Sequence, residues 1–471
     1  MTALIDAVNG VLWNYVLVYG LLAVGIYFTV RLGFLQIRHF PELFRVIAKS
    51  EETDRHGISP FQALTISLAS RVGTGNIAGV AVALSLGGPG AIFWMWIVAL
   101  LGMATAYAES TLAQLYKVEN SEGQYRGGPA FYIARGLGAR WAGSLFCVFL
   151  ILSFGLVFNA VQANSIADAM EGAFGFDKLW VGVAVAILAG IVIFGGIRQI
   201  ARVAQVVVPV MAGLYLLLAI VVVILNISEV PGVIALIFGH AFGLQEAAGG
   251  ITGGVLAAML NGVKRGLFSN EAGMGSAPNI AAVATPQPHH PSSQGFVQAL
   301  GVFIDTIVIC TCTAIMILLS DVYQFGGEIE GATLTQSALQ DQFGAFGLYF
   351  IAVAIFFFAF TSIIGNFAYA ENAMTFLRAD SKVPMTILRL AVLAMVVWGA
   401  YESVATVFNA ADASMGLMAT INLIAIMLLS GTVAKLTRDY FRQRAAGKSP
   451  VFVADDYPEL QGRIDSDIWS K

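Results

Sequence analysis

The sequence has 471 residues, of which 58% are hydrophobic and 11% are charged, and its formal net charge is −4. An ordinary soluble domain carries about 25% charged residues, so this composition excludes a protein that covers its whole surface with water-facing side chains. The mean hydropathy of +0.79 makes a lipid bilayer the expected solvent. A helix that crosses a bilayer needs about 20 apolar residues, so the chain has room for roughly ten to twelve spans. The three cysteines match no metal or disulfide framework.

Eleven apolar runs follow one another along the chain, and each is a predicted transmembrane helix. They cover residues 12–34, 60–86, 91–117, 141–166, 179–197, 204–227, 250–283, 295–320, 345–373, 385–406 and 412–434. The first run has no basic leading region and is longer than the apolar core of a signal peptide, so we expect it to remain in the protein. The predicted fold class is an all-α polytopic membrane protein with eleven transmembrane helices.

Lysine and arginine collect on one side of this eleven-span arrangement. The cations on that side are Arg38, Arg45, Lys49, Arg55, Lys117, Arg126, Arg135, Arg140, Arg198, Arg202, Arg378, Lys382, Lys435, Arg438, Arg442 and Arg444. On the other side, segment 321–344 holds the acidic residues Asp321, Glu328, Glu330 and Asp341 but no cation, and Lys178 is the only basic residue on that side. Basic connections stay in the cytoplasm, so we expect the N-terminus outside and the C-terminus inside.

Two of the predicted spans are interrupted by glycine and by polar residues near their middle. The second span contains "SLASRVGTGNIAGVAVALSLGGPG" and the seventh contains "MLNGVKRGLFSNEAGMGSAPN". These stretches also place Arg71, Lys264 and Arg265 inside the membrane, where a charge is costly and indicates a functional site.

The two interrupted spans open successive groups of five helices, spans 2–6 and 7–11. An odd-numbered group that is repeated in tandem inserts with opposite orientation, and interrupted helices at matching positions of inverted halves indicate the midplane site of a transporter. The predicted organisation is an extra helix and basic loop (1–59), two five-helix repeats (60–228 and 229–434) and a cytoplasmic tail (435–471).

Glycine lets the backbone leave the helix in both interrupted spans. The freed amides and carbonyls must line a cavity, because hydrocarbon cannot satisfy them. Amides at the N-terminus of a half-helix suit a carboxylate, and free carbonyls and hydroxyls suit a small cation. One such site can hold a zwitterionic amino acid beside a sodium ion.

Five separated motifs give the chain a family resemblance over residues 55–435. They read "RVGTGNIAGVAVALSLGGPGAIFWMW", "GMATAYAE", "GGPAFYI", "KRGLFSNEAGMGSAPN" and "QGFVQALGVFIDT". Together they resemble the alanine or glycine:cation symporter family. The resemblance implies sodium-coupled uptake of small neutral amino acids, with Na+ as the coupling ion. It also implies the five-plus-five inverted-repeat fold of the amino-acid symporter superfamily with one extra N-terminal helix, in a prokaryotic cytoplasmic membrane.

The same resemblance implies a set of binding residues. For the substrate these are Thr74, Gly75 and Asn76 in the first break and Phe268, Gly273 and Met274 around the second, while Gln162 and Asn164 face the same cavity. We expect Met274 and Phe268 to close the pocket over a small side chain. Gln162 is equally compatible with a hydrogen bond between helices.

The wider fold implies a sodium site between the first break and the ninth span. Its expected ligands are the hydroxyls of Thr361 and Ser362 and the carbonyls of Ala69 and Val72. Either hydroxyl could instead bond a carbonyl of its own helix, four residues back.

The remaining buried charges are interpreted as structural. Arg71, Lys264, Arg265 and Glu271 are expected to form an internal charge cluster that holds the break in shape, and Asp305 is either structural or part of coupling. Coupling to protons through Glu271 or Asp305 is the alternative to sodium. A channel is disfavoured because a pore with rings of like residues is usually built by an oligomer, whereas this chain carries a pair of internal repeats. A membrane enzyme is disfavoured because it would need a nucleophile and a base, or a metal cluster, at membrane depth, and the sequence indicates neither. Nothing in the sequence indicates nucleic-acid binding. A preference between alanine and glycine is left open.

Overall fold

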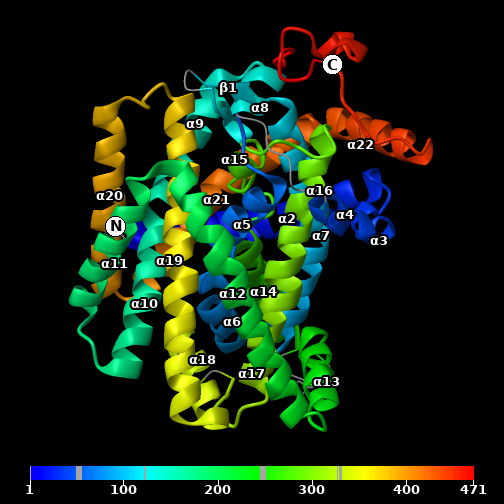
Figure 1. Cartoon of the computed structure of the whole chain (residues 1–471). Helices are drawn as coiled ribbons and strands as arrows, with labels where there is room; N and C mark the ends of the chain where they lie inside the picture. Colours follow the sequence, from blue (N-terminus) through cyan, green and yellow to red (C-terminus); the bar gives the residue numbers. More distant parts are fainter. Residues whose placement is uncertain are drawn as a thin grey trace.

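The computed structural model describes residues 2–48, 56–120, 123–243, 251–325, 327 and 331–470. Within these ranges the chain is helical, except for one short hairpin in which β1 (Val118–Glu119) pairs with β2 (Tyr125–Arg126) in antiparallel fashion (Figure 1). Lys49, Arg55, Glu328, Glu330 and the first residue of the predicted span 250–283 lie outside the described residues.

The first half contains helices that coincide with the predicted apolar runs and shorter helices that lie outside those runs. They are α1 (Thr2–Val11), η1 (Leu12–Leu17), α2 (Val18–Arg31), α3 (Leu35–Arg38), α4 (Phe40–Ala48), α5 (Pro60–Arg71), α6 (Thr74–Gly87), α7 (Gly90–Leu115), α8 (Pro129–Gly136), α9 (Arg140–Leu150), η2 (Ile151–Val157), α10 (Phe158–Phe174), α11 (Lys178–Ile193) and α12 (Gly196–Leu225). The short helices α3, α4 and α8 lie outside the predicted runs. The segments η1 and η2 are π-helical turns inside longer helices.

The second half of the chain also contains long helices and short connecting helices. Its elements are α13 (Val230–Ala241), α14 (Ile251–Asn270), α15 (Pro278–Ala281), α16 (Pro291–Val302), the π-helical η3 (Phe303–Cys310), α17 (Thr311–Leu318), α18 (Gly331–Phe343), α19 (Ala345–Phe376), α20 (Lys382–Tyr401), α21 (Val404–Leu428), α22 (Ser430–Ala445), η4 (Ala454–Asp456) and η5 (Pro458–Leu460). The short helices α8, α13 and α18 were not expected from the sequence.

Eight helices in the described ranges are long and apolar enough to cross a membrane. They coincide with eight of the eleven predicted spans, with shifted ends: the first begins at Ala7, and the last runs from Val404 to Leu428 before the chain turns into α22. The other three predicted spans are the two interrupted segments and α11, which has only 16 residues. An interruption leaves half-helices, so the segment is not a single long apolar helix.

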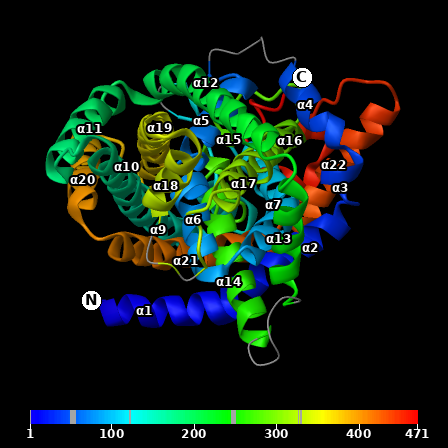
Figure 2. The same cartoon turned by 90° about the horizontal axis from the view of Figure 1, so that it is seen from below.

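The first broken helix lies at the centre of the bundle. Seen from below, α5 and α6 are surrounded by α7, α10, α12, α14 and α19 (Figure 2). Of the 14 residues of α6, 13 are buried, so this helix has no lipid-facing stripe and is apolar or small on all sides. By contrast, α12 exposes apolar side chains such as Val206 and Leu217, as expected of a helix that faces lipid.

The two ends of the bundle differ in what they carry. The β1–β2 hairpin, α8, α22 and the C-terminus gather at one end, and α13 and α18 lie at the opposite end (Figure 1). The β1–β2 hairpin and α22 therefore share an end, while α18, which carries Asp341, lies at the other. Figure 2 shows α1 at the periphery beside α21.

Candidate functional site

The first break is a two-residue gap between α5 and α6. Helix α5 begins at a capping box in which Ser59 Oγ accepts from the backbone N–H of Gln62 at 3.1 Å. It ends at Arg71, and after Val72 the Gly73 N–H donates to Asn76 Oδ1 at 3.0 Å. A Cβ on Gly73 would lie 2.2 Å from Ser362 Oγ. Only glycine fits here, because α19 approaches the backbone this closely.

Gln162 of α10 caps the start of α6. Its Oε1 accepts from the Thr74 N–H at 3.0 Å and from the Thr74 hydroxyl at 2.7 Å. The N-terminus of a helix carries free N–H groups and a partial positive charge, so an oxygen acceptor is favoured at this point. Asn164, two residues on, donates instead to the carbonyls of Gly399 and Glu402 and so joins α10 to α20.

The second break runs from Glu271 to Ala277. Glu271, Gly273 and Gly275 have φ values of +57°, +89° and +83°, in the left-handed region that glycine adopts readily and other residues rarely. The freed N–H of Gly273 donates to Glu109 Oε1 at 3.2 Å, and its carbonyl accepts from Asn422 Nδ2 at 2.9 Å. The open backbone is thus held by polar side chains.

Glu109 and Asn422 are two further polar residues at this break, and neither was predicted from the sequence to have a role. Glu109 is fully buried, and its Oε2 accepts from Asn422 Nδ2 at 2.8 Å. Tyr132 donates its hydroxyl proton to Asn422 Oδ1. Glu109 could have been recognised from the sequence, because it is a carboxylate inside the predicted span 91–117. The sequence holds no comparable indication for Asn422.

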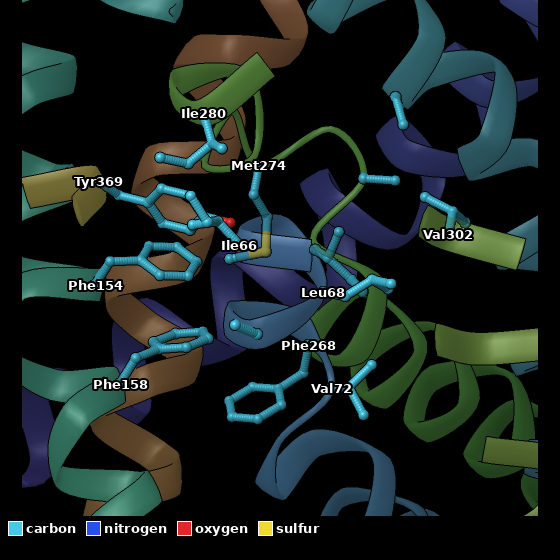
Figure 3. Packing of buried hydrophobic residues seen from close by; sticks show 14 of the residues in the cluster. Ile66, Leu68, Val72, Phe154, Phe158, Phe268, Met274, Ile280, Val302 and Tyr369 are labelled. Atoms are coloured by element: carbon cyan, nitrogen blue, oxygen red, sulfur yellow. The ribbon is translucent and has the colours of Figure 1, made fainter. Parts of the chain in front are cut away.

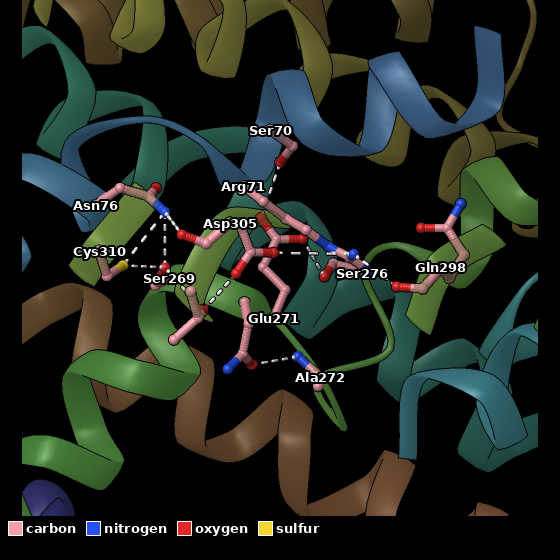
Figure 4. Close-up of polar contacts among 12 residues, drawn as sticks. Ser70, Arg71, Asn76, Ser269, Glu271, Ala272, Ser276, Gln298, Asp305 and Cys310 are labelled. Carbon is pink, nitrogen blue, oxygen red and sulfur yellow. Dashed lines mark hydrogen bonds and ion pairs between the residues drawn. The ribbon is translucent and has the colours of Figure 1, made fainter. Parts of the chain in front are cut away.

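The two breaks contact each other. Asn76 Nδ2 of the first break donates to Ser269 Oγ at 2.9 Å and to the carbonyl of Asp305 at 2.8 Å (Figure 4). A Cβ on Gly75 would lie 2.8 Å from Cδ1 of Phe268. The structure therefore brings Gly75, Asn76, Phe268 and Ser269 together, although about 190 residues separate the two breaks.

Phe268 and Met274 are both buried. The ring of Phe268 stacks on Phe158 with centroids 4.7 Å apart and on Phe408 at 5.5 Å. Figure 3 shows Phe154, Phe158 and Tyr369 in a column, with Met274 and Phe268 drawn to one side of it. Aromatic rings thus border the place where the breaks meet.

The four expected sodium ligands are only partly brought together. Ser362 Oγ donates to the Ala69 carbonyl at 2.8 Å and also lies 3.0 Å from the Phe358 carbonyl. Thr361 Oγ1 donates to the Phe358 carbonyl at 2.9 Å, on its own helix. Ser362 therefore links α19 to the first break beside Val72, whereas the hydroxyl of Thr361 bonds three residues back.

The four charged residues expected in one cluster are divided between two groups. Lys264 Nζ lies 3.0 Å from Asp412 Oδ2, and Arg265 Nη2 donates to both Asp412 oxygens at 2.8 and 2.6 Å. Arg71 lies elsewhere: its Nη1 donates to the Gln298 carbonyl at 3.2 Å and is 4.0 Å from Asp305 Oδ2. Asp412 belongs to α21 and had not been assigned a role.

Glu271 joins the second group and makes two contacts with hydroxyls. Its Oε1 lies 3.0 Å from Ser70 Oγ, and its Oε2 accepts from Ser276 Oγ at 2.5 Å (Figure 4). Both serines are buried. Glu271 therefore connects the end of α5 to the second break.

A polar cavity of about 850 Å³ opens near the hairpin end of the molecule. Residues at the β1–β2 hairpin, the α11–α12 junction, the end of α19 and the start of α20 line it, including Arg126, Arg198, Glu371 and Lys382. None of the predicted site residues lines this cavity. The described residues contain no group of three or more histidine, cysteine or acidic side chains that could hold a metal ion.

Apolar helices packed around two interrupted helices with a buried polar centre are the architecture of a membrane-embedded protein. The chain belongs to the sodium:alanine symporter family, whose model matches residues 1–454. This family match makes the protein a transporter and not an enzyme, and it confirms the family predicted from the five motifs.

Curated relatives match nearly the whole chain. The amino-acid carrier protein AlsT of Bacillus subtilis (strain 168) is 50% identical over 459 residues, which cover 98% of this chain and 96% of the relative. A probable sodium/glutamine symporter, GlnT, of the same organism is 49% identical, covering 96% of this chain and 93% of the relative. Among solved structures, a manganese transporter of Eremococcus coleocola shares the fold with a TM-score of 0.52 at 14% identity, covering 82% of each chain.

Proposed function

We propose that this protein is a secondary transporter that moves small neutral amino acids, alanine and glycine, into the cell together with sodium. The observation that carries the proposal is the contact between the two broken helices, where Asn76 bonds both Ser269 and the Asp305 carbonyl. A site between two half-helices changes shape when either half moves, which is what alternating access requires. The family description supports both alanine and sodium.

The substrate carboxylate binds at the N-terminus of α6 in this proposal. Gln162 Oε1 holds that position in the structure through its two bonds to Thr74. A carboxylate there gains from the same N–H donors and from the helix dipole. Gly75 leaves room for it, Gly273 keeps the second break open, and Phe268 and Met274 limit the size of the side chain.

Sodium binds where α19 meets the first break. Ser362 Oγ and the Ala69 carbonyl are the pair that supports this placement, since they already lie 2.8 Å apart. The Val72 carbonyl and Thr361 complete the proposed set. Hydroxyls and carbonyls are neutral ligands, so they bind the ion without retaining it after the inward step.

The same proposal includes eleven spans, with two inverted groups of five helices at 60–228 and 229–434 after an extra N-terminal helix. The two interrupted spans and α11 supply the three crossings beyond the eight long helices. The basic hairpin, α22 and the tail 435–471 face the cytoplasm of a prokaryotic cell, with the N-terminus outside.

The experiment is uptake of radiolabelled alanine into proteoliposomes under imposed gradients. We expect an inward sodium gradient to drive accumulation and unlabelled glycine to compete. Accumulation driven by a proton gradient with no dependence on sodium would contradict sodium coupling.

Glutamine is the specific alternative substrate, because one relative at 49% identity is named a probable sodium/glutamine symporter. Competition by glutamine and glycine in the same assay separates the two. Stronger inhibition by glutamine than by glycine would contradict the small-substrate proposal.

A further inference from the structure

Glu271 lies among buried oxygen atoms from three segments. Ser70 Oγ, at the end of α5, is 3.0 Å from Glu271 Oε1 and 2.5 Å from Asn366 Oδ1 on α19. Ser276 Oγ, within the second break, is 2.5 Å from Glu271 Oε2. All four side chains are at most 4% exposed. Each separation is that of an O–H···O hydrogen bond.

The orientation of the Asn366 amide is fixed by its other neighbour. Asn366 Nδ2 donates to Asn159 Oδ1 at 3.0 Å, and Asn159 Nδ2 donates in turn to the Gly155 carbonyl at 3.0 Å. A carbonyl accepts only, so Asn159 presents its oxygen to the NH₂ group of Asn366. Asn366 Oδ1 therefore faces Ser70 as an acceptor and brings no proton to that contact.

Three oxygen–oxygen contacts thus share the two hydroxyl protons of Ser70 and Ser276. The buried hydroxyl of Tyr369 faces the same carboxyl group but takes part in none of these three contacts. Ser276 supplies the proton toward Glu271 Oε2, and Ser70 supplies the one toward Asn366 Oδ1. The contact between Ser70 Oγ and Glu271 Oε1 is left without a proton unless the carboxyl group carries one. We propose that Glu271 is a proton-binding site: in this conformation it is a neutral carboxylic acid that donates from Oε1 to Ser70 Oγ.

The other two carboxylates nearby have partners that suit the charged form. Glu109, on α7, accepts from the backbone N–H of Gly273 and from the side-chain amide of Asn422, one donor on each oxygen. Asp305, on η3, lies 4.0 Å from the guanidinium of Arg71 and accepts from the hydroxyl of Thr306. Glu271 differs because its oxygens meet only hydroxyls.

The charged and titratable groups that face Glu271 come from every element around it. They are Arg71 on α5, Asp305 on η3, Glu109 on α7 and the buried hydroxyl of Tyr369 on α19. Arg71 is the one cation among them, and its ion pair is with Asp305. A single guanidinium cannot neutralise three buried carboxylates, so a proton on Glu271 lowers the cost of burying the group.

Because Glu271 bridges α5 and the second break, movement between these segments separates it from Ser70. Exposed to water, the acid then releases its proton, and transport becomes sensitive to pH. This consequence rests on the proposed function, whereas the protonation itself does not.

Infrared spectroscopy of the purified protein at neutral pH tests the protonation directly. We expect the C=O stretch of a buried, protonated carboxyl group in the wild type and its loss, by one group per molecule, in Glu271→Gln. The Gln amide replaces the proton with an N–H donor to Ser70, so the fold is expected to be retained. An unchanged band in Glu271→Gln, or no band in the wild type, would overturn the proposal.

Two matched variants sharpen the infrared result. Glu42→Gln changes a buried carboxylate that is paired with Arg45 at 2.6 Å and Arg444 at 3.2 Å, so the band is expected to remain. Ser70→Ala removes the acceptor of the proposed proton, so the band is expected to shift in frequency. A band that appears only after sodium is removed would show that sodium binds at this site and would contradict the proposed protonation of Glu271.

The consequence for transport is measured in proteoliposomes at a constant sodium gradient. We expect an inward proton gradient to change alanine uptake several-fold in the wild type and not in Glu271→Gln. An equal response in both would contradict the role of Glu271 in transport. Absence of uptake in the wild type would count against the proposed function, while the infrared result would still stand.

Discussion

Asn76 is hydrogen-bonded to Ser269 across 193 residues of sequence, with Nδ2 and Oγ 2.9 Å apart. The Asn76 side chain thus connects α6, which follows the first break, to the last turn of α14, which precedes the second break. Its Oδ1 accepts from the Gly73 N–H, so the same side chain also closes its own break. A movement of either half-helix must stretch or break these bonds.

Replacing Asn76 by alanine is expected to weaken the binding of both alanine and sodium, because the two breaks lose their shared contact. Binding of labelled alanine across a sodium titration measures both effects. Asn261→Ala is the matched control, since the Asn261 amide bonds the carbonyl four residues back on α14 and, among the described residues, makes no bond to the first break. Equal affinities in Asn76→Ala and wild type would show that the bridge is not needed for binding.

Gly75→Leu is expected to abolish alanine binding. Even a Cβ at this position would lie 2.8 Å from the Phe268 ring, so a branched side chain would fill the space proposed for the carboxylate. Gly79→Ala, one turn further along α6, is the control, because a Cβ there meets nothing closer than 3.8 Å. Wild-type affinity in a folded Gly75→Leu protein would disprove the placement of the substrate.

Met274→Ala is expected to admit larger neutral amino acids such as valine and leucine. One methylene in an apolar pocket is worth roughly 1–3 kcal/mol, so the preference should change by tens-fold or more. Competition against labelled alanine gives the ranking, with Met316→Ala on α17 as a control at another fully buried methionine. An unchanged ranking would place Met274 outside the pocket.

Removing the hydroxyls of Thr361 and Ser362 together is expected to raise the sodium concentration for half-maximal uptake by an order of magnitude or more. The geometry predicts that Ser362→Ala has the larger effect, because Ser362 contacts the Ala69 carbonyl and Thr361 does not. Sodium and alanine must strengthen each other's binding equally, so alanine affinity is measured across a sodium titration.

The control for the sodium site is Thr386→Ala, which removes a hydroxyl that bonds back to the Lys382 carbonyl on α20. We expect its titration curve to overlay that of the wild type. If the curve of the double variant overlays it as well, sodium binds at another position.

Asp412→Asn is expected to destabilise the folded protein by about 3 kcal/mol or more, the usual cost of breaking a buried ion pair. The change leaves Lys264 and Arg265 without their shared carboxylate. Unfolding in mixed detergent measures the loss. Asp168→Asn, whose partner Lys178 is partly exposed, should cost no more than about 1 kcal/mol, and equal losses would contradict a structural role for Asp412.

The sequence by itself determined the class of the protein and the position of both helix breaks. Membrane spans can be predicted from composition and long apolar runs, because insertion depends mainly on the free energy of transferring side chains from water to lipid. Glycines such as Gly73 and Gly273 interrupt a helix through local backbone freedom. These signals lie within about twenty neighbouring residues, and the family motifs lie in the same stretches.

Only the tertiary structure decided which buried polar groups meet. Arg265 and Asp412 are 147 residues apart, and Ser70 and Asn366 are 296 apart. The way in which α14 and α19 pack against the first broken helix determines these partners. As a result, the charged residues expected in one cluster lie in two groups, and Glu109 and Asn422 contact the second break. A buried polar group must find a partner, but the sequence does not say which one, because that depends on how the helices cross.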